Sequence, residues 1–209
     1  EKYTFRNYHR VLFTGEVEAH FKLNRNAANT KQFLLNDFKY YTSLYCRIKA
    51  LRSNFNKEFE HLYFNQLNDL SGHYMMIMSA CILNDSEEDE KIKIIGYQYD
   101  RVFTLLHLQK AYVNNIIADL VYAISDEIRS MPAAGIAAVF EKHLLAALSD
   151  IKKLQVTETF NYNYFKDVGY DDLPTRFKRY FFARVDYFIA KESKAEMRQS
   201  FENLVRNNG

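Results

Sequence analysis

Apolar residues recur along most of the chain at alternating intervals of three and four, the spacing that gathers side chains on one face of an α-helix. This period predicts helices over 34–48, 57–69, 73–83, 92–106, 113–128, 135–148, 177–189 and 194–208. The aromatic stretch 155–172 has no clean period and is interpreted as a loop or a short strand. Only two prolines and six glycines occur, which disfavours a β-architecture with many turns.

Residues 1–30 are polar and lack the helical period, with a short strand or hairpin expected around residues 10–13. No Gly/Ser/Pro-rich linker follows them. We therefore predict an all-α fold, an irregular multi-helix bundle, in which an irregular N-terminal segment (1–30) precedes one helical domain (31–209).

Acidic residues crowd together just ahead of the helix expected at 92–106. Ser86 and Asp89 have the three-residue spacing of a capping box, and Asp85 precedes them. Carboxylates in a first turn also complement the helix dipole. The alternative is a metal-binding loop, but the run lacks the alternating oxygen ligands and central glycine of a calcium loop. We interpret Asp85, Ser86 and Asp89 as a helix cap and expect no metal site.

Composition and charge narrow the function classes. The formal net charge is +2, too small to argue for general polyanion binding, and no apolar run is long enough to span a bilayer. The two cysteines, Cys46 and Cys81, are interpreted as small buried hydrophobes in a reducing compartment. Because no charged-then-apolar leader is present, a cytoplasmic location is expected, for a chain that starts within a longer protein.

No catalytic constellation stands out in the sequence. The six histidines form no HxH or HExxH motif and no Cys/His pairing with zinc-ligand spacing, and no phosphate loop or nucleophile elbow occurs. Glu16, Glu18 and His20 are the one local acid–base cluster, and an exposed strand face looks the same. No cofactor is expected in this chain.

The C-terminal segment 174–209 is basic, with eight Lys and Arg against four Asp and Glu. Arg176, Lys178 and Arg179 cluster at the start of its first helix, where they are candidates for contact with DNA phosphates. Arg184 shares one helix face with a stripe of apolar residues that we interpret mostly as core, namely Phe177, Tyr180, Phe181, Phe188 and Ile189. Since a guanidinium on such a face needs a partner, Arg184 is expected either in a buried ion pair or at a domain interface.

The order of these helices resembles one particular family. The string ILNDSEEDEKIKIIGYQYDRVF, the helix ending in SDEIR and the later RYFFARVDYFIAKE are similar to the helical region of GmrSD-like proteins. These are type IV, modification-dependent restriction and phage-defence systems, in which a ParB/sulfiredoxin-like nucleotidase domain precedes the helical region and an HNH nuclease domain often follows it. The resemblance covers residues 65–192. Leu105 and Leu106 stand where the family often has a basic pair, so the role of that pair is not carried over.

The resemblance implies a non-catalytic helical scaffold within a nucleotide-dependent defence endonuclease. Its partners are then the adjacent nucleotidase and HNH nuclease domains, together with DNA. The alternative is a freestanding helical adaptor that recruits a protein partner or forms a homo-oligomer. A third reading, an enzyme that uses Glu16, Glu18 and His20, has the least support in the sequence.

Overall fold

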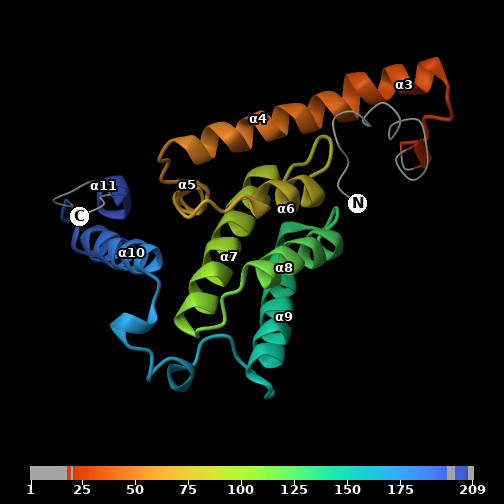
Figure 1. Cartoon of the computed structure of the whole chain (residues 1–209). Helices are drawn as coiled ribbons and strands as arrows, with labels where there is room; N and C mark the ends of the chain where they lie inside the picture. The colour runs from red at the N-terminus through yellow and green to blue at the C-terminus, as the bar shows by residue number, and fades with distance from the viewer. Residues whose placement is uncertain (1–17, 20, 197–200, 207–209) are drawn as a thin grey trace. The chain divides into compact units, whose positions relative to one another are not determined.

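The computed structural model describes residues 18, 19, 21–196 and 201–206, and the regular elements of this part of the chain are all helical. The predicted all-α class is therefore confirmed. The strand or hairpin expected at 10–13 lies outside the described residues. The elements, drawn in Figure 1, are α3 (Ala27–Phe33), the π-helix η2 (Leu34–Phe38), α4 (Lys39–Ser53), α5 (Glu60–Leu67), α6 (Gly72–Ala80), α7 (Glu88–Leu108), α8 (Asn114–Glu127), α9 (Ala133–Lys152), the 3-10 turns η3 (Tyr162–Tyr164) and η4 (Tyr170–Asp172), α10 (Thr175–Ser193) and α11 (Phe201–Arg206).

The chain forms two compact units, one ending at Arg47 and the other beginning at Ile48. The boundary thus falls inside α4, whereas the sequence pattern places it at residue 30. In the first unit, α3, η2 and α4 follow one another without a break. Asn26 caps this helical run, because its side-chain oxygen accepts the backbone N–H of Ala28 at 2.8 Å.

α7 is the central helix of the second unit. It packs against α5, α6 and α9, while α8 packs against α6 and α9. Its apolar residues at three- and four-residue intervals are fully buried, among them Ile92, Ile95 and Leu106. The core of this unit therefore lies around the face of α7 that the hydrophobic period predicts.

The turn before α7 differs from the predicted cap. α7 begins at Glu88, and its N-cap is Glu87, whose side chain makes no capping hydrogen bond, so the Ser86 capping box is not formed. Asp85 instead holds the turn, since its carboxylate accepts the N–H groups of Ile82 and Glu87 at 3.2 and 3.0 Å. Asp89 lies in the first turn of the helix, where its charge complements the dipole.

Lys91 completes this turn from inside the protein. Its ammonium lies 2.7 Å from Asp85 Oδ2 and donates to the carbonyl of Ala80 at 3.1 Å. Only 3% of the Lys91 side chain is exposed. A buried ammonium group needs partners of this kind. The negative charge that neutralises Lys91 comes from Asp85, the first residue of the acidic stretch before α7.

The connection between α9 and α10 contains the two 3-10 turns and no strand. Of the loop and the short strand considered for residues 155–172, the structure therefore shows the loop.

Both cysteines are free, and Cys46 is exposed, so the expectation of two buried thiols holds only for Cys81. None of the helices in the described residues combines the length and apolarity that crossing a membrane requires.

Candidate functional site

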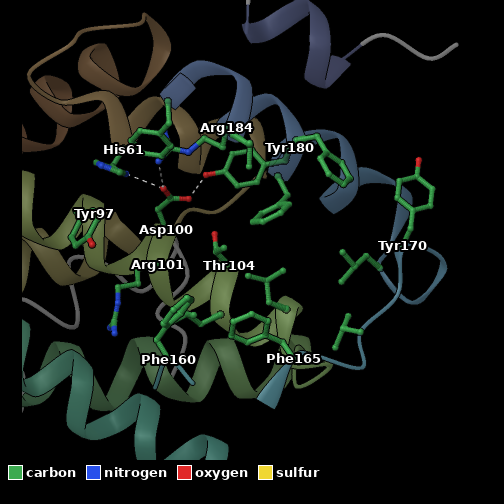
Figure 2. A pocket seen from close by; sticks show the side chains of 18 of the residues that line it. His61, Tyr97, Asp100, Arg101, Thr104, Phe160, Phe165, Tyr170, Tyr180 and Arg184 are labelled. Atoms are coloured by element: carbon green, nitrogen blue, oxygen red, sulfur yellow. Dashed lines mark hydrogen bonds and ion pairs between the residues drawn. The ribbon is translucent and has the colours of Figure 1, made fainter. Parts of the chain in front are cut away.

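An aromatic pocket of about 670 Å³ lies in the second unit between α7, the 160–173 connection and α10 (Figure 2). Its walls are mostly rings and aliphatic side chains, including Tyr97, Phe160, Phe165, Phe181 and Leu108. A volume of this size and a mainly apolar lining with a few polar groups are typical of ligand and anchor pockets.

Asp100 on α7 forms the polar floor of the pocket and is 4% exposed. Its Oδ2 atom lies 2.9 Å from His61 Nδ1 and 3.3 Å from Arg184 Nη2, and its Oδ1 atom accepts the hydroxyl of Tyr180 (Figure 2). Because an ionised carboxylate only accepts hydrogen bonds, His61 Nδ1 is the donor in this contact. The carboxylate is thus held by donors from α5 and α10.

Tyr180 is among the most buried side chains of the molecule. Burial raises the pKa of its hydroxyl well above the usual value, and the neighbouring Asp100 charge adds to this effect. Tyr180 therefore keeps its proton near neutral pH and donates it to the carboxylate.

Arg184 is paired with this carboxylate and is packed between rings. Its guanidinium carbon lies 3.7 Å from the ring centre of Phe64 and 4.8 Å from that of Phe188. The side chain is 8% exposed. Of the two environments expected for Arg184, the structure places it in the buried ion pair.

A second polar cluster fixes one wall of the pocket. Arg101 Nη1 lies 2.7 Å from Glu141 Oε2 on α9, and its Nη2 donates to the Thr159 hydroxyl at 2.5 Å. Thr159 in turn donates to Glu141 Oε1 at 2.6 Å. Burial acts to raise the pKa of Glu141, but the hydrogen bonds from Thr159 and Arg101 outweigh it, so the pKa is lowered. These contacts attach the start of the connection, next to Phe160, to α7 and α9.

The rim of the pocket is unusually apolar for a protein surface. Phe182, Val185 and Phe188 line the pocket from α10 and are 50%, 39% and 43% exposed. Ile189 follows Val185 by about one helical turn and is 61% exposed. The prediction that Phe188 and Ile189 belong to the core is therefore wrong, although Phe177 and Tyr180 on the same helix are buried. The buried positions of α10 end at Arg184, and no residue of the helix after it is buried.

The three basic residues predicted to contact DNA lie on the first turns of α10, and each of them already interacts with another group. Arg176 donates to the carbonyl of Leu67 at 2.8 Å and lies 2.6 Å from Asp69 Oδ2. The Lys178 ammonium lies 4.0 Å from the ring centre of Tyr170. Arg179 lines the same shallow hollow as Arg176. Phosphate contact through these residues stays a prediction.

The acid–base cluster proposed near the N-terminus is described only in part. Glu16 and His20 lie outside the described residues, and Glu18 lies 3.9 Å from Arg25. Within the part of the chain that the structure describes, no three His, Cys, Asp or Glu side chains are grouped to hold a metal ion.

Sequence reasoning missed Asp100 and His61 as members of the site. Asp100 carried a usable signal, because it stands between the apolar positions Tyr99 and Val102 on a helix with a buried face. His61 gave no such signal, since it became part of the site only through the contact of α5 with α7.

Comparisons with protein-family models, with curated proteins and with solved structures find no match to this chain.

Proposed function

We propose that this chain is a helical interaction module that binds an apolar segment of a protein partner at the aromatic pocket. The observation that carries the proposal is the exposed apolar rim, formed by Phe182, Val185 and Phe188 at the cavity and by Ile189, about one helical turn beyond Val185 on α10. Large apolar side chains gathered at one place on a surface mark interaction sites, whereas single exposed ones are ordinary.

The polar floor supports binding in preference to chemistry. The Asp100 carboxylate already accepts hydrogen bonds from His61, Tyr180 and Arg184. Charges that neutralise one another inside the protein orient the surrounding rings and give the partner a preformed surface, which lowers the entropic cost of binding. A bulky apolar anchor inserted into such a pocket is the usual source of interface energy.

The resemblance to GmrSD-like proteins gives this module a context. In that context it acts in the cytoplasm as a scaffold, and the segment that enters the pocket belongs to the adjacent nucleotidase or HNH nuclease domain. A freestanding adaptor is the second candidate, with the same surface engaging a separate protein. The scaffold and the adaptor would both bind their partner at the α10 rim, so one experiment can test the two candidates.

The test is site-specific photocrosslinking in the intact protein. A photoreactive benzoylphenylalanine replaces Ile189 at the rim, and in a control variant it replaces Tyr122 on α8, which is 59% exposed against 61% for Ile189. After irradiation, mass spectrometry identifies the linked peptide. We expect the Ile189 probe to give one apolar segment, and Phe182→Asp to abolish the link by placing a charge in the contact.

The position of the linked peptide separates the two candidates. A peptide from another domain of the same polypeptide supports the scaffold, and a peptide from a separate protein or a second copy supports the adaptor. Equal crosslinking from Ile189 and Tyr122, or a link that persists in Phe182→Asp, would overturn the proposal.

A further inference from the structure

The charged groups that line the aromatic pocket are already paired within the chain. Asp100 Oδ2 lies 3.3 Å from Arg184 Nη2 and 2.9 Å from His61 Nδ1. The Arg101 guanidinium lies 2.7 Å from Glu141 Oε2. A charged group of a ligand would therefore lose its hydration in the pocket without gaining a free counter-ion, which is costly. The pocket thus favours a neutral occupant.

Thr104 on α7 differs from these groups, because its hydroxyl is not paired. Within the described part of the chain it makes no hydrogen bond, and its side chain is half-buried in the wall of the pocket. Figure 2 shows Thr104 between the polar floor and the rings of Phe160 and Phe165. The other hydroxyls of the lining that make no hydrogen bond within these residues belong to Tyr97 and Tyr170, which are 46% and 63% exposed and stay hydrated. An occupant of the pocket must therefore displace water from Thr104 or bond its hydroxyl.

We propose that the pocket receives a tyrosine side chain of the partner, and that the Thr104 hydroxyl forms a hydrogen bond with its phenol group. This rests on the function proposed above, and it adds which type of residue enters the pocket. Walls made of rings favour an aromatic occupant, because offset and edge-to-face ring contacts attract beyond the burial of area alone. A threonine hydroxyl both donates and accepts, so it can pair with a phenol in either direction.

Other side chains satisfy only part of this arrangement. Leucine or phenylalanine would fill the apolar space, but either would remove water from Thr104 and leave its hydroxyl unpaired, which costs affinity. A carboxylate, a phosphate or an ammonium group would enter a site whose charges are already neutralised. A site that bonds one polar group of its ligand discriminates against the analogue that lacks this group. Tyrosine matches both the rings and the hydroxyl.

The experiment measures binding of N-acetyl-tyrosine amide and N-acetyl-phenylalanine amide to the full chain by changes in its amide NMR spectrum. The two probes differ only by the phenolic hydroxyl. We expect the changes at pocket residues such as Leu105 and Leu108. Thr104→Val replaces the hydroxyl with a methyl group of similar size. It should weaken binding of the tyrosine probe about fivefold, the effect of one hydrogen bond, and change binding of the phenylalanine probe less than about twofold.

Two further variants control for a general effect of substitution. Thr104→Ser keeps the hydroxyl and should keep the affinity difference between the probes. Thr175→Val makes the same change at an exposed position of α10 outside the pocket, and should bind both probes as the wild type does. An equal effect of Thr104→Val on both probes, or no effect on either, overturns the proposal. So does the absence of binding up to the solubility limit of the probes, or binding that changes only residues outside the pocket.

The photocrosslinking experiment tests the proposed function separately. A single partner segment that links to the Ile189 probe but contains no tyrosine contradicts the choice of anchor and leaves the interaction module in place. Binding of the tyrosine probe that depends on Thr104, without a specific link from Ile189, supports the anchor chemistry and overturns the proposed function.

Discussion

Arg184 on α10 and Asp100 on α7 form a buried ion pair, in which Nη2 lies 3.3 Å from Oδ2 although 84 residues separate the two in sequence. Tyr180 binds the same carboxylate one turn earlier on α10. The two contacts join α10 to α7 at the floor of the pocket. The position of the exposed rim therefore depends on a polar contact in the core.

Asp100→Ala should destabilise the protein by about 3 to 5 kcal/mol, because it leaves the guanidinium of Arg184 buried without its charge partner. The free energy of unfolding in urea measures the effect. Asp126→Ala provides a matched control, since Asp126 and Arg129 are also 3.3 Å apart but are 84% and 60% exposed. That variant should lose about 0 to 1 kcal/mol. An Asp100→Ala protein as stable as the Asp126→Ala protein contradicts the structural role of the pair.

Asp85 should make the protein sensitive to acid. Burial acts to raise its pKa, but the hydrogen bond from Lys91 and those from Glu87 and Ile82 outweigh it, so the pKa is lowered from its usual 3.8. A depressed carboxyl pKa stabilises the fold above the unfolded-state value, and this stability is lost as the pH falls through the folded-state value. Asp85→Asn should be less stable than the wild type at pH 7, and the difference should shrink below pH 4. Urea unfolding at pH 7, 4, 3 and 2.5 checks this, and a constant difference counts against it.

The helices could be predicted from the sequence because their signal is local. The apolar period of α7 and α8 depends only on residues within each helix, and it gave their bounds within a few residues. The start of α7 was less accurate, since Asp85 acts through the distant Lys91 and not through a capping box. Helix ends depend on such individual contacts more than helix interiors do.

The pocket could not be predicted, because its parts come from separate segments. The sequence showed that Arg184 needed a partner, but only the packing of α10 on α7 identified Asp100. The same limit explains the error at Phe188 and Ile189. Periodicity shows which residues share a face, whereas exposure depends on whether another element covers that face.

Gly72→Ala should be poorly tolerated at the start of α6. A Cβ atom there would lie 2.5 Å from Val121 Cγ2 and 2.7 Å from Tyr99 Oη, and both neighbours are packed in the core. We expect a loss of about 1 to 3 kcal/mol, the usual cost of overpacking. Gly135→Ala is the comparison, because its Cβ would meet the flexible Met131 side chain at 2.9 Å. That variant should be neutral or more stable, since alanine favours the helix by about 1 kcal/mol. Similar losses in both would show that the contacts at Gly72 are not decisive.

His73 should make stability fall between pH 6.5 and pH 3. It is fully buried, and neither ring nitrogen has a hydrogen-bond partner in the described residues. Burial, with a smaller contribution from the charge of Arg52, lowers the pKa of His73 to about 3.

The unfolded chain therefore takes up a proton near pH 6.5, whereas the folded chain stays neutral down to about pH 3. Over that interval the folded state should lose about 1.4 kcal/mol of stability per pH unit through this residue. His73→Phe keeps a ring in the same space and removes the titrating group. Its stability should match or exceed that of the wild type at pH 7, and its advantage should grow as the pH falls from 6 to 4. Urea titrations at half-unit pH steps measure the advantage. Parallel pH profiles for the two proteins would show that His73 gains its proton in both states, and that its burial has no part in acid sensitivity.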